Sequence, residues 1–303
     1  MNFFYLTNFM ANAPKKILVT SDYENYRIDK FLAKFLSLPK SLIHKDLRKN
    51  RIKVNKKKIK FDYRLAIGDI VILFKDYTIS GANKKSVIDR KLIAKFKKSI
   101  ILKNSDYLII NKWNGIASQG GSKINFSIDD IIKEFNTEVS KLRLVHRLDK
   151  ETSGIMMFAL NIKSSRYFYS LFLNRKIKKT YYAIVENKPP RKIGYFKDAI
   201  IEKGKKINAE TKYEIVKNLD KNLYLLKLFP KTGRKHQIRI HCAVNGCPIL
   251  ADSKYNVNST YNNKSNSLYL HAGEIEFIDQ LGKKINVKAE LPSHFTKYIK
   301  IDN

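Results

Sequence analysis

A single carboxylate, Asp149, stands among cations in the stretch LVHRLDKETSG, residues 144–154. Arg147 and Lys150 lie close to it in sequence, and nearby positive charge favours the ionised form of an acid. A carboxylate held in this form can serve as a nucleophile or a general base, and less readily as a proton donor. The alternative is structural, because an aspartate at a corner between two apolar runs can close an Asx turn or cap a helix.

The chemistry available to Asp149 depends on whether a second acid stands near it. Glycosidases need a second carboxylate at a fixed distance from the first. Glu151 is close in sequence, but in an extended or turn backbone we expect its side chain to point elsewhere. Because we find no other strong candidate, the sequence favours chemistry that uses one carboxylate.

A second segment with reactive side chains, TGRKHQIRIHCAVNGCPILAD, covers residues 232–252. Its first half predicts a basic strand on which Arg234, His236 and Arg239 face a phosphate or a carboxylate. Arg239 is the expected ion partner of Asp149.

The same segment holds two histidines and two cysteines, the residue types that zinc sites use. In a strand, His236 and His241 are five positions apart and would face opposite sides. Cys242 and Cys247 flank a Val-Asn-Gly turn signal, and the chain has no other cysteine. We therefore predict no metal site, and keep a metal-dependent hydrolase acting on nucleic acid as an alternative.

The segment KKTYYAIVE, residues 178–186, predicts a strand with Tyr181 and Tyr182 on opposite faces. Core packing is the simplest role for such a pair. In a protein that binds RNA, a tyrosine that faces a cleft also offers a ring on which an extruded base can stack.

The charge of the chain points to a polyanionic partner. Its 303 residues include 60 Lys and Arg against 27 Asp and Glu, a formal net charge of +33. Residues 27–64 alone carry 14 Lys and Arg and 3 Asp. A coding bias toward Lys, Ile and Asn could raise the charge without a function, but this clustering favours a dedicated binding element. Phosphate contacts would then dominate the affinity.

The elements that must hold these residues fall into a small first module and a larger second part. Apolar residues at helical spacing predict one helix within 27–40 that Pro39 ends, and a second helix with Ser41 as N-cap. Short strands follow, turning at Asn55 and Gly68. We divide the chain into an N-terminal extension (1–26), this module (27–75), a linker (76–98) and a second domain (99–303).

Strands dominate the predicted second domain, with a few helices. SIILKNSDYLIINK predicts two strands, SIDDIIKEFN a helix capped near Ser127, and SSRYFYSLFLNRKI another helix. Two cysteines provide no disulfide framework, no apolar run reaches the length of a membrane span, and the first residues make a poor signal peptide. We expect a cytoplasmic protein.

The first module resembles the S-four-like RNA-binding domain, which occurs in a small-subunit ribosomal protein and in several RNA-modifying enzymes. The resemblance implies that structured RNA docks on the second helix and the loop after it. The cationic residues predicted to bind RNA there are Lys45, Arg48, Lys49, Arg51 and Lys53.

Four segments of the second domain, in this order, resemble the RluA/RluC/RluD family of pseudouridine synthases. They are HRLDKETSG, KKTYYAIV, TGRKHQIRIH with GCPILAD, and LYLHAGEIEF. The family usually has Lys-Pro-x-Gly where this chain has Lys-Trp-Asn-Gly at 112–115, a change that relaxes a turn and removes no catalytic group. The segment around Ser118 looks most like the RluC branch.

This resemblance implies the isomerisation of uridine to pseudouridine in RNA, with large-subunit ribosomal RNA as the partner and no cofactor or metal. It implies three catalytic residues, Asp149, Tyr181 and Arg239, and further RNA-binding residues, Arg147, Arg234 and His236. It also implies an α+β fold with a mixed, largely antiparallel central sheet flanked by helices, and a monomeric protein.

Two questions stay open at this point. The residues do not decide whether Asp149 acts as nucleophile or as base, or which uridines are modified. A non-catalytic RNA-binding or ribosome-assembly factor would also account for the charge and for the first module.

Overall fold

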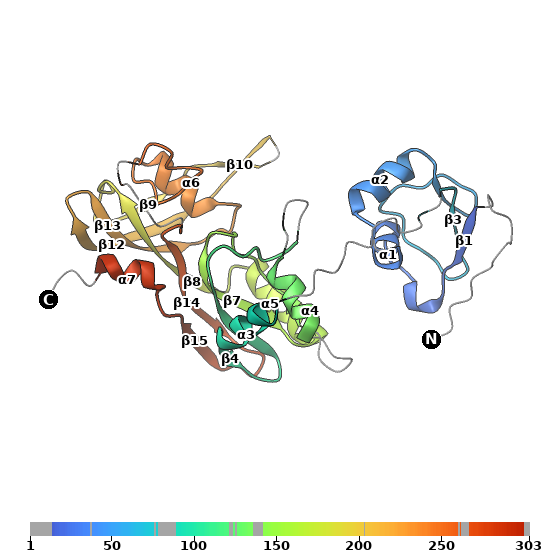
Figure 1. Cartoon of the computed structure of the whole chain (residues 1–303), viewed down its shortest axis with the longest axis horizontal. Helices are drawn as coiled ribbons and strands as arrows, with labels where there is room; N and C mark the ends of the chain where they lie inside the picture. Colours follow the sequence, from blue (N-terminus) through green and yellow to red (C-terminus); the bar gives the residue numbers. More distant parts are fainter. Residues whose placement is uncertain are drawn as a thin grey trace. The chain divides into compact units, whose positions relative to one another are not determined.

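The structure is a computed structural model that describes residues 14–36, 38–75, 77, 89–120, 124, 126–135, 142–202, 204–259, 261 and 267–299. The chain divides into two compact units, Met1–Val87 and Ile88–Asn303 (Figure 1). Within the described residues, no helix is both long and apolar enough to cross a membrane.

The N-terminal unit contains two helices and a three-stranded antiparallel sheet. The helices are α1 (Ile28–Phe35) and α2 (Lys40–Arg48); the strands β1 (Lys15–Leu18), β2 (Ile52–Val54) and β3 (Ile70–Leu73) lie in the order β1-β3-β2, and a short 3-10 helix, η1 (Ser21–Tyr23), follows β1. The predicted apolar stripes are buried, among them Phe31 and Leu32 on α1 and Leu47 on α2. Their burial against the sheet fixes both helices.

Local details of this unit agree with the sequence at the turns and differ at one cap. Asn55 and Gly68 both have positive φ, as the predicted turns require. The expected cap at Ser41 is wrong, because α2 already starts at Lys40 with Pro39 in the N-cap position. Proline ends the first helix and, with its fixed φ, leads directly into the second.

The structured units extend beyond the boundaries that we predicted from sequence. β1 and the buried residues Ile17 and Val19 lie within the region assigned to an N-terminal extension. At the other boundary, α3 (Arg90–Lys98) lies within the predicted linker. Asp89 caps this helix and its Phe96 is fully buried in the core of the second unit. The remaining residues 1–13, 76 and 78–88 of those two segments lie outside the described residues.

The second unit is built on a ten-stranded sheet with the strand order β4-β5-β7-β14-β8-β13-β12-β9. β15 pairs with β14 and β6 with β7; β7 and β14 are parallel, and the other recorded pairs in this sheet are antiparallel. The predicted mixed, largely antiparallel sheet is therefore confirmed. Its strands are β4 (Ile100–Lys103), β5 (Tyr107–Lys112), β6 (Arg143–Leu144), β7 (Ser153–Ala159), β8 (Lys178–Glu186), β9 (Ile193–Phe196), β12 (Thr211–Asp220), β13 (Leu223–Pro230), β14 (Leu270–Ile278) and β15 (Lys284–Lys288).

Helices cover both faces of one half of this sheet. α3 and α4 (Ile128–Phe135) pack with Met156 and Phe158 of β7, whereas α5 (Ile162–Leu173) packs with Ile155 and Met157. Because side chains alternate along a strand, these two pairs belong to opposite faces. Burial on both faces explains why β7 is a continuous apolar run.

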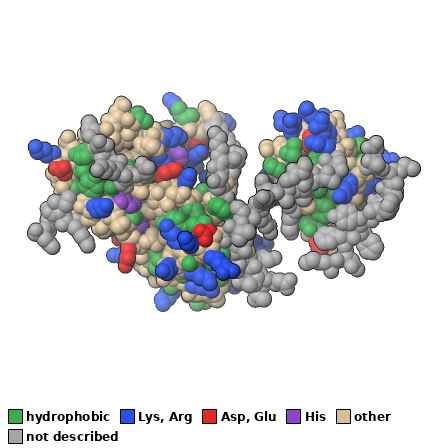
Figure 2. All heavy atoms as spheres, in the orientation of Figure 1, with side chains coloured by type: hydrophobic (Ala, Val, Ile, Leu, Met, Phe, Trp, Pro, Cys, Tyr) green, Lys and Arg blue, Asp and Glu red, His purple; other side chains and the backbone are tan. Residues whose placement is uncertain are grey.

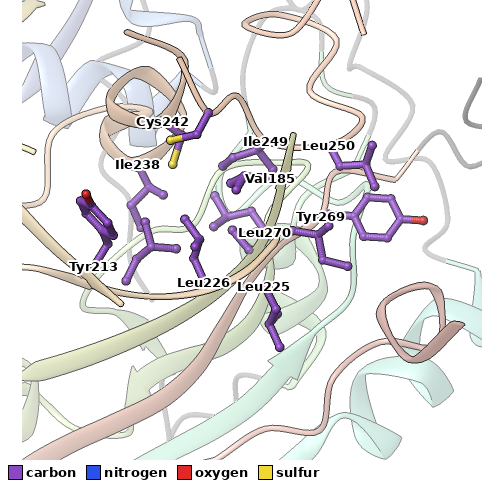
Figure 3. Close-up of a cluster of buried hydrophobic side chains, with 14 of the residues drawn as sticks. Val185, Tyr213, Leu225, Leu226, Ile238, Cys242, Ile249, Leu250, Tyr269 and Leu270 are labelled. Carbon is purple, nitrogen blue, oxygen red and sulfur yellow. The ribbon is translucent and has the colours of Figure 1, made fainter. Parts of the chain in front are cut away.

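The other half of the sheet packs with α6 (Gln237–Val244) and α7 (Ser293–Ile299). Figure 3 shows Ile238 and Cys242 of α6 directed at apolar side chains from the sheet, including Val185 and Leu226. Phe295 of α7 is fully buried in the same cluster. A small separate hairpin, β10 (Ile200–Glu202) with β11 (Lys205–Ile207), completes the elements.

The strand predicted at the start of RKHQIRIHCAVNG is wrong, because residues 237–244 form α6. Ile238 and Ile240 suggested alternation, but the residues that are buried together are Gln237 with His241 and Ile238 with Cys242. Both pairs have the i, i+4 spacing of a helix face. The Asn-Gly turn signal is the end of this helix, with Asn245 as C-cap and Gly246 at positive φ.

Candidate active site

Asp149 lies in the loop between β6 and β7, where its side chain is 27% exposed and lines a cleft. Its backbone carbonyl accepts a hydrogen bond from the N–H of Thr152 at 3.2 Å, which closes the turn. Within the described residues its carboxylate accepts no hydrogen bond, so the side chain makes neither the Asx turn nor the helix cap that was the structural alternative. The carboxylate is left available to a ligand in the cleft.

The neighbouring segment 112–118 holds this loop in place. Ser118 Oγ donates to the carbonyl of Leu148 at 2.6 Å and accepts from its N–H at 3.0 Å. The N–H of Gly115 donates to the carbonyl of Lys150 at 3.0 Å, and Asn114 Nδ2 donates to the carbonyl of Glu151 at 2.8 Å. The sequence pattern showed only a glycine-containing turn here, so this supporting role was missed.

Lys112 is the deepest of these supports. Its side chain is fully buried at the end of β5, and Nζ donates to the carbonyls of Ile116 at 3.0 Å, Trp113 at 3.1 Å and Lys150 at 3.3 Å. Burial lowers the pKa of Lys112 to about 7, against the charges of Asp149 and Glu151, which raise it. A lysine at the end of an otherwise apolar strand was the signal available in the sequence.

Gly154 at the end of the Asp149 motif allows two strands to meet. It has a φ of +110°, and a Cβ at this position would collide with the backbone of Ala272 on β14. Only glycine permits this close parallel pairing of β7 and β14. The Asp149 loop is therefore held at the centre of the sheet.

Arg239 does not form the ion pair with Asp149 that the sequence suggested. Its Nε and Nη2 donate to the two carboxylate oxygens of the buried Asp252 at 2.7 and 2.6 Å, and Nη1 lies 3.5 Å from Oε2 of Glu151. The helix presents the guanidinium to a different acid, and Glu151 reaches it from the Asp149 loop. Burial acts to lower the pKa of Arg239, but the bonds to Asp252 and the charges of Asp252, Asp149 and Glu151 raise it.

The basic side chain nearest to Asp149 among the described residues is that of His236, whose Nε2 lies 3.7 Å from Oδ1 of the acid. Nδ1 of the same ring is 2.9 Å from the hydroxyl of Tyr255. His236 occupies the N-cap position of α6 with a φ of +54°, a left-handed conformation that is costly for most side chains. Burial lowers the pKa of His236, although the charge of Asp149 raises it. The ring is therefore neutral at pH 7.

The two tyrosines of β8 lie on opposite faces, as predicted. Tyr181 lines the cleft with Asp149, and burial followed by the negative charge of Asp149 raises its pKa. Tyr182 faces away, and its hydroxyl donates to Oε1 of Glu274 at 2.8 Å. Tyr181 thus presents a neutral phenol ring beside the carboxylate.

The cleft has a volume of about 1170 Å³ and is strongly cationic. Arg147 and Arg234, two of the predicted RNA-binding residues, lie in its lining together with His236. Two acids, Asp149 and Glu202, face eight lysines and arginines, namely Arg147, Arg175, Lys179, Lys231, Arg234, Lys235, Arg239 and Lys254. A cavity of this charge suits a polyanion better than an uncharged ligand.

The histidines and cysteines considered for zinc do not converge. His241 is a core residue, with Nδ1 2.9 Å from Oγ1 of Thr211 and Nε2 3.0 Å from the carbonyl of Asp198. Cys242 and Cys247 are free, buried thiols in the core cluster. Over the described part of the chain, no group of three potential metal ligands is found.

The remaining predicted RNA-binding residues belong to the N-terminal unit. Lys45 and Arg48 lie on α2, Lys49 and Arg51 follow it, and Lys53 lies on β2. All but Lys53 are exposed, and Lys53 places its ammonium 5.2 Å from the ring centroid of Phe74. Lys and Arg side chains gather over α2 in Figure 2.

The chain is similar to known proteins of one family. Residues 106–244 match the family described as RNA pseudouridylate synthase. The chain is 37% identical over 290 residues to the ribosomal large subunit pseudouridine synthase C of Rickettsia felis, covering 89% of this chain and 94% of the relative. It is 34% identical over 304 residues to the protein of the same name from Buchnera aphidicola subsp. Acyrthosiphon pisum, covering 93% and 96%.

A solved structure supports the same assignment. Human RNA pseudouridylate synthase domain containing 4 matches with a TM-score of 0.60 and 25% identity, covering 69% of this chain and 95% of that chain. Human RNA pseudouridylate synthase domain containing 1 shares the fold, with a TM-score of 0.55 and 22% identity over 64% and 83% of the two chains.

Proposed function

Because the chain belongs to the RNA pseudouridylate synthase family, we propose that it isomerises specific uridines of large-subunit ribosomal RNA to pseudouridine. The observation that carries this proposal is the position of Asp149, whose unbonded carboxylate faces a cationic cleft beside the ring of Tyr181. The names of the curated relatives support the large ribosomal subunit as the source of the RNA and agree with the resemblance to the RluC branch.

The reaction breaks the glycosidic bond, turns the uracil within the cleft and joins it to the ribose through carbon. The target base must first leave its stack, at a cost of a few kcal/mol. We assign the stacking ring to Tyr181 and the offsetting phosphate contacts to the cations of the cleft, including Arg147 and Arg234, and to the neutral ring of His236.

Asp149 is assigned the chemical step, as nucleophile at the sugar or base, or as the base that removes a ribose proton. Arg239 supports it indirectly. Its guanidinium is fixed by Asp252 and binds Glu151, two residues after Asp149 in the same loop. We therefore propose Arg239 as a residue that orients this loop and adds positive charge near the carboxylate.

The N-terminal unit is proposed to be an S-four-like RNA-binding domain. Its two helices and small sheet agree with that architecture, and its cations Lys45, Arg48, Lys49, Arg51 and Lys53 would position the substrate through phosphates. We further propose that the protein acts as a monomer in the cytoplasm, where ribosomal RNA is available.

The experiment compares wild-type protein with Asp149→Asn on transcribed large-subunit ribosomal RNA, with pseudouridine mapped after incubation. We expect discrete modified sites with the wild type and none with the variant, while both bind the RNA equally in a filter assay. Asn keeps the size of the side chain and removes the carboxylate. Equal modification by both proteins would remove the role of Asp149, and RNA binding without modification by the wild type would favour the assembly-factor hypothesis.

A further inference from the structure

Lys179 lies on the cleft side of β8, two residues before Tyr181 and on the same face of the strand. The preceding Lys178 points to the other side, where its Nζ pairs with Oε1 of Glu276 at 2.9 Å. The alternation of the strand thus separates a lysine with an acid partner from a lysine that faces the candidate active site.

The ammonium of Lys179 has no side-chain partner among the described residues, although the side chain is partly buried. Burial, followed by the positive charge of Arg175, lowers the pKa of Lys179. Glu210, an acid within electrostatic range of Arg175, is engaged with Lys231 at 2.6 Å. Two adjacent cations without their own acid repel each other, and a bound anion would relieve that repulsion.

Arg175 occupies a position that favours glycine. It follows the C-cap of α5 with a φ of +57°, and its N–H donates to the carbonyl of Phe172 at 3.2 Å. Glycine is the usual residue here because the left-handed conformation strains other side chains. Arg175 therefore adopts a conformation with an energetic cost, lines the cleft and forms no ion pair with a described residue.

The backbone of Gly233 lies next to Lys179. A Cβ built on Gly233 would be 4.0 Å from Nζ of Lys179, so the two residues face each other closely. The N–H of Gly233 forms no hydrogen bond within the described structure. Lys179, Arg175 and Gly233 all line the cleft, and an ammonium, a guanidinium and a free backbone amide are donors suited to phosphate oxygens.

We propose that Lys179, Arg175 and the Gly233 amide form a subsite for one RNA backbone phosphate next to the target uridine. This inference rests on the proposed function, because it takes the extruded nucleotide to lie between Asp149 and Tyr181. Lys179 and Tyr181 project from the same strand face, so a nucleotide stacked on Tyr181 brings its flanking phosphate toward Lys179.

The first experiment compares Lys179→Gln with Lys178→Gln as the matched control on the opposite face. Binding of transcribed large-subunit ribosomal RNA is measured by filter retention as a function of salt. We expect Lys179→Gln to reduce the slope of log K against log salt by about 1, and Lys178→Gln to leave it unchanged. An unchanged slope for Lys179→Gln overturns the subsite. Because this readout needs no isomerisation, it is independent of the proposed activity.

The second experiment locates the phosphate. Short RNAs spanning a mapped uridine carry one neutral methylphosphonate linkage on its 5′ or 3′ side. We expect one of the two linkages to lower kcat/KM of the wild type by about tenfold, and Lys179→Gln to lower kcat/KM on unmodified RNA by a similar factor. When the variant acts on RNA with that linkage, we expect no further loss of kcat/KM. If the loss of kcat/KM from the linkage and the loss from Lys179→Gln multiply for each of the two linkages, the proposal is contradicted.

Arg175→Gly separates a role of Arg175 in RNA binding from a role in stability, because the two roles predict different changes in RNA affinity and in the urea midpoint. Glycine removes the strain of the left-handed position, so the urea midpoint should rise above that of the wild type. At the same time, RNA affinity should fall several-fold, because a phosphate donor is lost. A variant that is more stable and binds RNA as well as the wild type would remove Arg175 from the subsite.

Discussion

Nε2 of His236 lies 3.7 Å from Oδ1 of Asp149, and Nδ1 of the same ring meets the Tyr255 hydroxyl at 2.9 Å. The histidine therefore links the Asp149 loop to the turn after α6. Asp252 holds that turn, since its Oδ1 accepts the N–H groups of Lys254 at 3.0 Å and Tyr255 at 3.1 Å. The same carboxylate binds Arg239, so one buried acid holds both the turn that carries Tyr255 and the guanidinium of Arg239.

His236→Asn tests how this ring affects the carboxylate. Asparagine tolerates the left-handed backbone, so α6 should keep its start. The pKa of His236 lies below its usual value, so the ring is neutral at pH 7 and becomes a cation only on acidification, when it pairs with Asp149 and makes the carboxylate less reactive. We expect kcat of the variant at pH 7 to be within about tenfold of the wild type. As the pH is lowered, kcat of the variant should fall less than kcat of the wild type. Identical pH profiles of kcat would contradict this account.

His146 predicts acid sensitivity of the fold. Its Nε2 accepts the N–H of Met157 at 2.9 Å, and burial lowers its pKa to about 3. The unfolded chain binds a proton near pH 6.5 and the folded chain only near pH 3, so stability is lost as the pH falls below 6.5. We expect this histidine to contribute roughly 1–2 kcal/mol to the difference in unfolding free energy between pH 7 and pH 5.

Urea unfolding at both pH values measures that difference, and His146→Gln is the comparison. Glutamine can still accept a hydrogen bond but does not titrate. The variant should lose less stability than the wild type between pH 7 and pH 5. An equal loss in both proteins would assign the acid sensitivity to other groups.

Local sequence pattern predicted the strands and their faces better than it predicted side-chain contacts. The mixed sheet and the opposite orientation of the two β8 tyrosines followed from local pattern and are present in the structure. The partner of Arg239 did not, because we assigned residues 237–239 to a strand, whereas they begin a helix that brings Asp252 to the guanidinium. Lys112 was missed because its partners are backbone carbonyls, which leave no side-chain signature. The catalytic role of Asp149 stays a prediction.

Two acids share Arg239, and they should contribute very differently to stability. Asp252 is fully buried and binds the guanidinium through two hydrogen bonds, whereas Glu151 is 41% exposed at 3.5 Å. Asp252→Ala leaves a buried cation without its partner and should cost about 3–5 kcal/mol. Glu151→Ala should cost no more than about 1 kcal/mol. Urea denaturation of the two variants compares them directly, and equal losses would show that the fold does not depend on the buried pair.

Tyr181 and Tyr182 offer a matched pair for the stacking role. Tyr181→Leu removes the ring from the cleft and should lower the rate of uridine isomerisation by about 5- to 150-fold, the equivalent of 1–3 kcal/mol for one stacked base. Tyr181→Phe keeps the ring and should retain much of the activity. Tyr182→Phe loses only the hydrogen bond to Glu274 and should act as the wild type. Single-turnover kinetics measure all three variants on unmodified RNA that contains a uridine isomerised by the wild type. Equal activity of the Leu and Phe variants at 181 would exclude stacking.

Lys112 should couple the stability of the fold to the position of the Asp149 loop. In Lys112→Met the length of the side chain is kept, but the carbonyls of Trp113, Ile116 and Lys150 lose their donor. A buried acceptor left unsatisfied costs about 1–3 kcal/mol. Only the bond to Ile116 is fully buried and water can reach the other two carbonyls, so we expect a total of about 2–4 kcal/mol, together with a fall in kcat. Lys150→Met, at an exposed position of the same loop, should change the unfolding free energy by less than about 0.5 kcal/mol. A Lys112→Met protein with wild-type stability and kcat would show that the loop is held without this lysine.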